Sequence, residues 1–134
     1  MELLPVFEEV SLVTANMKKW MEPKFTPTPA FMAPSTCEII SEPYGVCLIV
    51  GAFNYPITLS LMPLIGALAA GNCVVLKPSE MATKTEQLLV ELLPNYLDKE
   101  CFRVVIGDYK ISASLLEQRW DKIFFTGSPR VVTA

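Results

Sequence analysis

Asn54 places a primary amide at the end of a long apolar run, in the stretch GAFNYPITL that covers residues 51–59. Asparagine has low helix and strand preferences, and a buried amide must find hydrogen-bond partners. The residues alone leave two interpretations open. Asn54 is either a turn residue before Pro56, or a fixed hydrogen-bond donor.

Three further groups of polar or special residues follow segments that are expected to be strands. They are Lys77 with Glu80, Gly107 with Asp108, and Gly127 with Ser128. Ligands collect at the carboxyl ends of parallel strands, and most of these groups suit a nucleotide. The plainer alternatives are a solvated lysine after a strand and an ordinary helix N-cap at Ser128. The G-x-G-x-x-G phosphate loop is absent, because the six glycines never form G-x-G.

The segments that must position these residues alternate between strand-like and helix-like patterns. Apolar runs predict strands at residues 46–50, 72–77, 102–107 and 122–125. Helical patterns cover residues 56–71, 83–97 and 112–120. Pro63 predicts a kink or a later helix start, and Thr83 with Glu86 has the spacing of a capping box. This alternation predicts an α/β fold, with a Rossmann-like, mostly parallel sheet and helices on both faces.

The N-terminal part, residues 1–43, follows a different pattern from residues 44–134. An amphipathic helix is expected over residues 5–21, ending in the basic KKW. Four prolines make residues 22–36 an extended connector. Residues 37–41 alternate well enough for an edge strand, which Pro43 closes.

Composition excludes several classes of function. The 134 residues suit one ordinary domain, and a net charge of -3 without a basic cluster gives no footprint for nucleic acid. With no histidine, the chain cannot supply a His-based triad or His-ligated zinc. The four cysteines never form C-x-x-C, and the acidic N-terminus lacks the basic region of a signal peptide, so a reduced, cytoplasmic setting is expected.

No residue between Glu42 and Lys77 is charged, so a membrane hairpin must be considered. A spanning helix needs about 20 continuous apolar residues, whereas glycine, proline and asparagine repeatedly interrupt this run. We therefore expect no membrane segment, and read the run as strand, turn and helix instead.

Three motifs, in this order and spacing, resemble the aldehyde dehydrogenase superfamily: AFNYP, AAGNCVVLKPSE and WDKIFFTGS. Residues 41–72 and 92–108 resemble its class 3 branch, the fatty and aromatic aldehyde dehydrogenases, especially plant-like members. The resemblance covers about residues 20–130.

The resemblance implies an NAD(P)-dependent enzyme that oxidises aldehydes to carboxylic acids through a cysteine thiolate, and a homo-oligomer when complete. It assigns Asn54 to the oxyanion hole, Lys77 and Glu80 to the adenosine ribose, and Gly127 and Ser128 to the phosphate-binding turn. The cofactor is expected to be NAD, with NADP as the alternative. Residues 44–134 would then form a partial NAD(P)-binding domain.

The chain also departs from the family pattern. Phe53 stands where tryptophan is commoner, and Val132 where glycine is frequent. In the family the catalytic cysteine and glutamate lie beyond the FTGS turn, and none of the four cysteines here matches the nucleophile. The catalytic domain is therefore expected to be absent and the isolated chain inactive. The alternative is a non-catalytic remnant of the family that binds a nucleotide or a partner.

Overall fold

The computed structural model describes residues 2–127. Its helices are α1 (Leu3–Trp20), α2 (Thr58–Ala69), α3 (Thr83–Leu92) and α4 (Tyr109–Leu116), with single 3₁₀ turns η1 (Ala30–Met32), η2 (Glu80–Ala82) and η3 (Leu93–Asn95). Its strands are β1 (Lys24–Thr26), β2 (Cys37–Ile39), β3 (Val46–Val50), β4 (Cys73–Lys77), β5 (Phe102–Val104) and β6 (Lys122–Phe125). None of the helices in this range is both long and apolar enough to cross a membrane.

Four strands form one parallel sheet in the order β5-β4-β3-β6. This confirms the predicted α/β class and the predicted bounds of β3. The central strand β3 is buried from Cys47 to Val50, as expected for a strand covered on both faces. Because β4 and β6 flank β3 on opposite sides, the chain reverses its direction across the sheet after β5.

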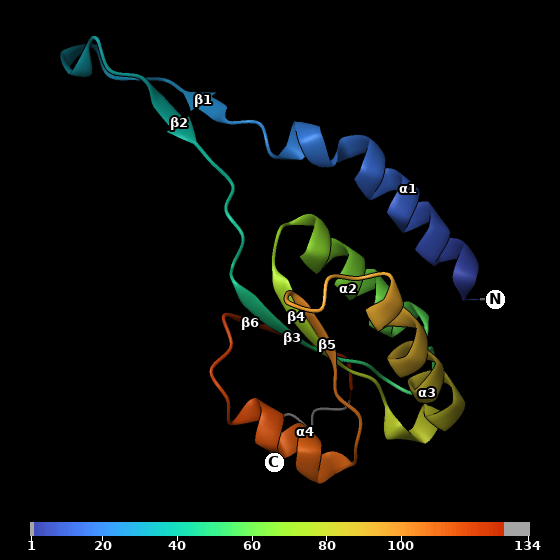
Figure 1. Ribbon diagram of the computed structural model, residues 1–134. Coiled ribbons are helices and arrows are strands. Elements are labelled where there is room, and N and C mark those ends of the chain that lie inside the picture. Colours follow the sequence, from blue (N-terminus) through green and yellow to red (C-terminus); the bar gives the residue numbers. More distant parts are fainter. Residues whose placement is uncertain (1, 128–134) are drawn as a thin grey trace.

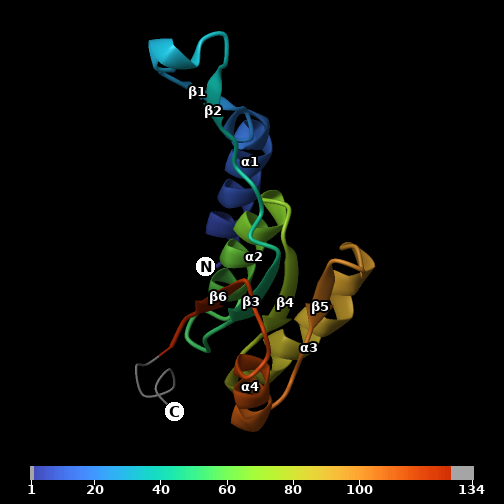
Figure 2. The same cartoon turned by 90° about the vertical axis from the view of Figure 1, so that its left-hand side faces the viewer.

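Helices cover both faces of the sheet. Figure 1 shows α2 on one face and α4 on the opposite one, while α1 lies along the outer side of α2, as Figure 2 shows from the side. The main core forms where α2 meets the strands, and its buried members are Cys47, Ile49, Leu64, Val74, Leu76 and Phe102.

Helix α2 begins later than its sequence pattern predicts. Pro56 lies in the turn before the helix, which starts at Thr58 and continues through Pro63. The Glu2 carboxylate accepts hydrogen bonds from the backbone N–H groups of Ile57 and Thr58, at 2.9 Å each. A side chain from the start of α1 therefore caps the N-terminus of α2.

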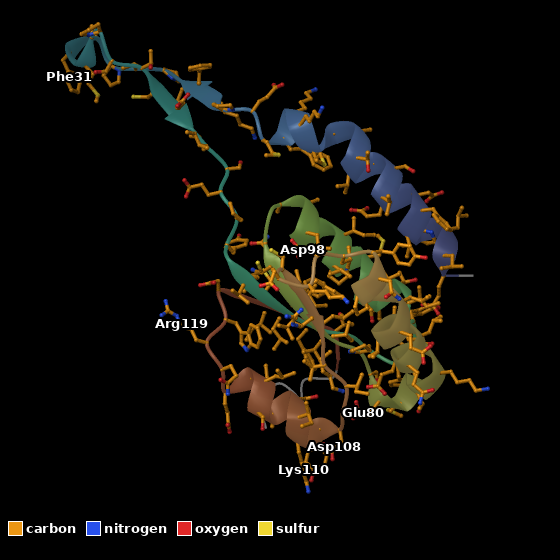
Figure 3. The ribbon with its side chains drawn as sticks, in the orientation of Figure 1. Phe31, Glu80, Asp98, Asp108, Lys110 and Arg119 are labelled. Atoms are coloured by element: carbon orange, nitrogen blue, oxygen red, sulfur yellow. The ribbon has the colours of Figure 1, made fainter. Side chains whose placement is uncertain are left out.

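The proline-rich segment is an arm rather than a simple connector. Its strands β1 and β2 pair antiparallel, and the arm extends away from the parallel sheet with η1 at its tip (Figure 1). The strand expected at residues 37–41 is shorter, and it pairs with β1 instead of the edge of the main sheet. Phe31 at the tip is 87% exposed (Figure 3).

The predicted capping box at the start of α3 is wrong. Thr83 is already helical, and its hydroxyl donates to the Glu80 carbonyl oxygen at 3.1 Å. Glu86 is buried instead of reaching back to the helix start, and its Oε1 has no hydrogen-bond partner among the described residues. The turn η2 precedes α3 directly, and Ala82, the residue before the helix, makes no side-chain cap hydrogen bond.

Candidate functional site

A cleft of about 1020 Å³ opens at the carboxyl ends of β3, β4 and β6. The loop after β3, the turn after β4 and one side of α4 form its walls. It lies where β3 separates β4 from β6, which is the point at which the strand order reverses. In open parallel sheets this switch point is the usual place for a ligand.

Lys77 ends β4 inside this cleft. Its side chain is only 1% exposed, and its ammonium donates a hydrogen bond to Oε2 of Glu80 at 2.6 Å. A buried ammonium is costly unless it is paired, and it carries three N–H donors. Since Glu80 is the one acceptor that this Nζ meets among residues 2–127, Lys77 retains donors for a ligand.

Glu80 faces the cleft from the turn η2, with its side chain 42% exposed. The hydrogen bond from Lys77 lowers the pKa of this carboxyl below its usual value, although partial burial opposes the shift. The carboxylate is therefore ionised at neutral pH and can accept hydrogen bonds from hydroxyl groups. Lys77 and Glu80, proposed as a pair from the sequence, are in direct contact.

Asn54 lies on the loop after β3 and lines the same cleft. Its side chain is exposed, and within residues 2–127 it makes no side-chain hydrogen bond with the protein. Because the Asn54 amide is exposed, it does not need a hydrogen-bond partner within the protein. The amide is therefore available to a ligand. The loop also contains a turn, because the Leu59 N–H donates to the Tyr55 carbonyl oxygen at 2.9 Å.

The loop that carries Asn54 is anchored at its first residue. The Gly51 N–H donates to the Lys77 carbonyl oxygen at 3.0 Å, which extends the β3–β4 ladder. A Cβ at Gly51 would lie 2.6 Å from the hydroxyl oxygen of Ser60 on α2. A side chain at residue 51 would therefore force the Ser60 hydroxyl to move, and glycine allows the loop to approach α2 without that shift.

The turn after β6 reaches the cleft through Gly127. The Thr126 N–H donates to the Val50 carbonyl oxygen at 3.2 Å, so this turn starts beside the end of β3. Ser128 and Val132 lie outside the described residues, and the predictions made for them remain predictions.

Sequence reasoning missed the contribution of α4. Tyr109 and Ser112 line the cleft from this helix, and Glu117 does so from the position directly after it. Asp108, singled out as a possible ligand residue, instead caps α4 by accepting from the backbone N–H groups of Lys110 and Ile111. The pattern of apolar and polar residues in α4 could have indicated that one face of the helix packs on the sheet. It could not have indicated that the helix also lines a cleft.

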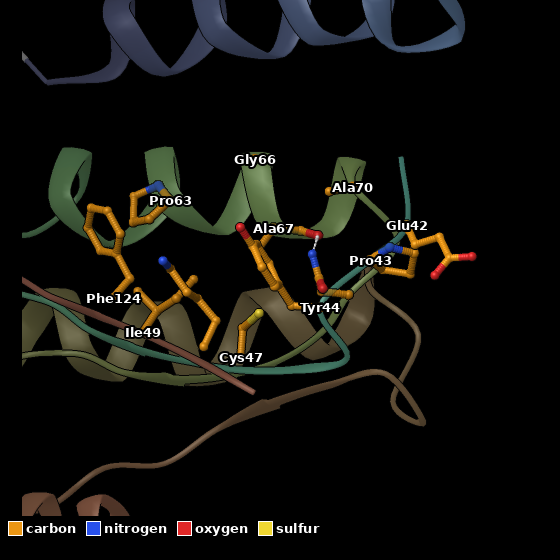
Figure 4. Close-up of a pocket in the computed structure, with 12 residues that line it drawn as sticks. Glu42, Pro43, Tyr44, Cys47, Ile49, Pro63, Gly66, Ala67, Ala70 and Phe124 are labelled. Carbon is orange, nitrogen blue, oxygen red and sulfur yellow. Dashed lines mark hydrogen bonds between the residues drawn. The ribbon is translucent and has the colours of Figure 1, made fainter. Parts of the chain in front are cut away.

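A second cavity of about 300 Å³ lies between α2 and the amino-terminal half of β3 (Figure 4). Most of its lining is apolar. The Asn72 amide faces it, but Asn72 accepts from the Gly45 N–H at 3.0 Å and donates to the Ala67 carbonyl oxygen at 2.9 Å. The other polar side chains of the lining are Glu42, Tyr44 and Lys122, and the Lys122 ammonium lies over the Tyr44 ring, 5.4 Å from its centroid.

None of the four cysteines lines the larger cleft. Cys47 borders the smaller cavity, and burial raises the pKa of its thiol. Cys73 begins β4, at the opposite end of that strand from Lys77, while Cys37 lies in the arm. Residues 2–127 therefore bring no thiol to the cleft.

Comparison with known proteins gives one consistent result. The model of the family described as "Aldehyde dehydrogenase family" matches residues 2–134. The chain is 48% identical over 130 residues to mouse aldehyde dehydrogenase family 3 member B3, covering 97% of this chain and 27% of that protein. It is 50% identical over 123 residues to human aldehyde dehydrogenase family 3 member B1, covering 92% of this chain and 26% of that protein. The chain thus spans about a quarter of the length of the curated relatives it matches.

A solved structure agrees with these matches. The substrate-bound state of Staphylococcus aureus AldH superposes with a TM-score of 0.91 at 34% identity, covering 96% of this chain and 28% of that one. A plant relative, an aldehyde dehydrogenase of Craterostigma plantagineum, is 48% identical over 130 residues, so plant and mammalian relatives match about equally well.

Proposed function

Because this chain belongs to the aldehyde dehydrogenase family, we propose that its 134 residues are the nucleotide-binding part of an NAD(P)-dependent enzyme that oxidises aldehydes to carboxylic acids. The observation that carries this proposal is the buried Lys77 ammonium, which is paired with Glu80 and turned toward a large cleft at the switch point of the sheet. Residues 44–134 would be part of the nucleotide-binding domain, and residues 1–43 an N-terminal addition.

The residues of the cleft fit a dinucleotide. Lys77 would donate to the ribose hydroxyls and Glu80 would accept from them. The turn at Gly127 and Ser128 would approach the pyrophosphate with backbone N–H groups. When bound, the nicotinamide supplies the hydride acceptor for the oxidation. NAD is the proposed cofactor, with NADP as the alternative.

Asn54 would act on the aldehyde itself. Its amide N–H would donate to the carbonyl oxygen, which becomes negatively charged when a nucleophile attacks the carbon. The exposed position of Asn54 at the cleft supports this role. The nucleophile would have to come from outside residues 2–127, since no cysteine in this range lines the cleft.

For the same reason we propose that the 134-residue chain alone does not oxidise aldehydes. The alternative, a non-catalytic module that binds a nucleotide or a partner, is favoured by the exposed apolar side chains of the arm, among them Phe25 and Phe31. A homo-oligomer of the complete enzyme and a cytoplasmic location also remain proposals. The free state of all four cysteines is consistent with a reducing compartment.

Calorimetric titration of the 134-residue chain with NAD tests the nucleotide assignment. Lys77→Ala should weaken the binding of NAD by about 10-fold or more, because it removes hydrogen bonds that the charged Lys77 ammonium donates to the ligand. Lys84→Ala is the matched control, since Lys84 is an exposed lysine on α3 outside the cleft, and it should bind as the parent does. Equal weakening in both variants, or no binding by the parent, would contradict the assignment.

A second measurement separates the two functions. A full-length aldehyde dehydrogenase carrying these 134 residues in place of its own should form NADH from a medium-chain aldehyde, while the isolated chain should not. Loss of activity in that full-length protein, with nucleotide binding retained, would favour the non-catalytic module.

A further inference from the structure

Cys73 begins β4, and Cys101 immediately precedes β5, the neighbouring strand. The register pairs Val74 of β4 with Phe102 of β5, so the residues one position earlier also face one another. The Val74 N–H donates to the Cys101 carbonyl oxygen at 2.8 Å, which holds the two backbones together at this point. Neighbouring strands are about 4.8 Å apart, within the Cα–Cα range of about 4.4–6.8 Å that disulfides use.

Both side chains also point to the same face of the sheet. Val74 and Phe102 belong to the core cluster beneath α2, and side chains alternate between faces along a strand. Cys73 therefore projects to the other face, and continuing the alternation back from Phe102 by one residue would place Cys101 on that face as well. The raised pKa of the Cys101 thiol, whose largest cause is the neighbouring Cys73 thiol, agrees with this placement.

From this placement we propose that Cys73 and Cys101 form a redox-sensitive dithiol, which a peroxide oxidises to an intrachain disulfide joining β4 to the start of β5. The site lies at the end of β4 opposite Lys77, and Figure 3 shows Asp98, which precedes Cys101, well separated from Glu80. The proposal is therefore independent of the proposed nucleotide function.

The chemistry balances in two steps. The exposed Cys101, as its thiolate, attacks one peroxide oxygen, so an S–O bond forms, the O–O bond breaks, and water or an alcohol leaves after protonation. The Cys73 thiol then attacks the sulfenic sulfur, so the S–S bond forms, the S–O bond breaks, and water leaves. Overall the dithiol loses two electrons and two protons to the peroxide.

The charges around the pair set its pH dependence. The neighbouring Cys73 thiol raises the pKa of Cys101 most, and loss of hydration and then the carboxylates of Asp98 and Glu100 raise it further. Since the thiolate is the reactive form, oxidation should accelerate as the pH rises toward that raised pKa. At neutral pH the pair is expected to stay reduced unless peroxide accumulates.

The test is to treat the reduced, purified 134-residue chain with hydrogen peroxide, to block remaining thiols, and to map the disulfides by mass spectrometry without reduction. We expect the Cys73–Cys101 linkage to exceed every other pairing by about 10-fold, because neighbouring groups have a high effective concentration. Dithiothreitol should restore both thiols. Cys37→Ser, the matched control in the arm, should leave this linkage intact, whereas Cys73→Ser and Cys101→Ser should abolish it.

The same treatment in concentrated guanidinium chloride shows whether the fold directs the pairing. There the preference for Cys73–Cys101 should be lost, and mixed linkages should appear. Three results would overturn the proposal: intermolecular Cys101 linkages as the main product, oxidation of Cys101 to sulfinic acid without a disulfide, or an equal distribution of linkages in the native and unfolded chains. The wild-type map decides the question even if a serine variant fails to fold.

Discussion

Replacing Asn54 with alanine removes an exposed amide from the cleft without opening a cavity in the core. In a full-length enzyme that carries this segment, Asn54→Ala should lower kcat by about 10²–10³-fold, as is usual for the loss of one oxyanion donor. The affinity for NAD should change little. Steady-state kinetics of the parent enzyme and of Asn54→Ala with the same aldehyde provide the measurement.

Asn95→Ala is the control for this experiment, because Asn95 is exposed and its amide bonds only to the Glu91 carbonyl oxygen. It should keep the parental kcat. If Asn54→Ala also remains within a few-fold of the parent while the chemical step limits the rate, Asn54 serves only as a turn residue.

Glu80 should make the stability of the chain depend on pH. Its pKa in the folded state lies below the ordinary value of 4.5, mainly because Lys77 donates a hydrogen bond to it. A depressed pKa contributes stability above the unfolded pKa, and this contribution is lost as the pH falls through the folded pKa. The Tm difference between wild type and Glu80→Gln should therefore be constant near neutrality and shrink below about pH 4.5. A difference that does not change on acidification would show that Lys77 does not hold the carboxylate.

The same residue should influence cofactor choice. A 2′-phosphate near Glu80 would be repelled, by about 1 kcal/mol in bulk water and about 4 kcal/mol at an effective dielectric near 20, for charges about 4 Å apart. Lys77 attracts that phosphate over a similar distance, so we expect a modest preference for NAD. Glu80→Gln should shift the kcat/KM ratio of the full-length enzyme toward NADP, and Lys77→Ala should weaken both cofactors, NADP more. An unchanged ratio in Glu80→Gln would mean that this carboxylate does not meet the ribose.

At the scale of elements, the hydrogen bonds between the Glu2 side chain and the start of α2 are the clearest target for mutation. Glu2 accepts from two N–H groups at the start of α2, where a negative charge also interacts favourably with the helix dipole. Glu2→Ala should lower the free energy of unfolding by about 1 kcal/mol. Glu8→Ala, at an exposed position of α1, should have little effect. Urea denaturation of the two variants compares them, and equal midpoints would exclude a capping role.

This cap also shows what local patterns can predict. Strand β3 was predicted at its observed bounds because a continuous apolar run of five residues marks a strand buried on both faces. The capping partner of α2 lies 55 residues away in sequence, so no local pattern reveals it. The expected capping box of α3 failed for the opposite reason: Thr83 and Glu86 have suitable spacing, but the chain enters α3 from a 3₁₀ turn.

The cleft was predictable only in part. Lys77, Glu80 and Asn54 were identified because polar residues stand out at the ends of apolar strands, and the resemblance to the family suggested their roles. Strand β1 was missed because three residues are too few to show alternation. The wall formed by α4 depends on how the helix crosses back over the sheet, which only the tertiary structure specifies.

For the whole molecule we expect self-association of the 134-residue chain. Within the described residues β6 is an edge of the sheet, with Ile123 42% and Phe124 47% exposed, and unprotected edges invite pairing with other chains. Ile123→Lys should weaken association by about 10-fold, because a charged edge strand pairs poorly. Leu88→Lys, on the exposed side of α3, should change it much less. Sedimentation velocity over a concentration series measures both, and a monomer at all concentrations would contradict the expectation.

The strand order has a consequence for biosynthesis. β3, β4 and β5 follow one another both along the chain and across the sheet, so they can pair in the order in which they are made. The partner of β3 on its other side arrives much later, since the bond between the Val46 N–H and the Asp121 carboxylate spans 75 residues. At about 5–20 residues per second, a ribosome needs about 4–15 s for that length. During this interval the nascent chain exposes one side of its most apolar strand, and the cleft lacks the wall that β6 provides, so this is the stage at which chaperone binding would matter most.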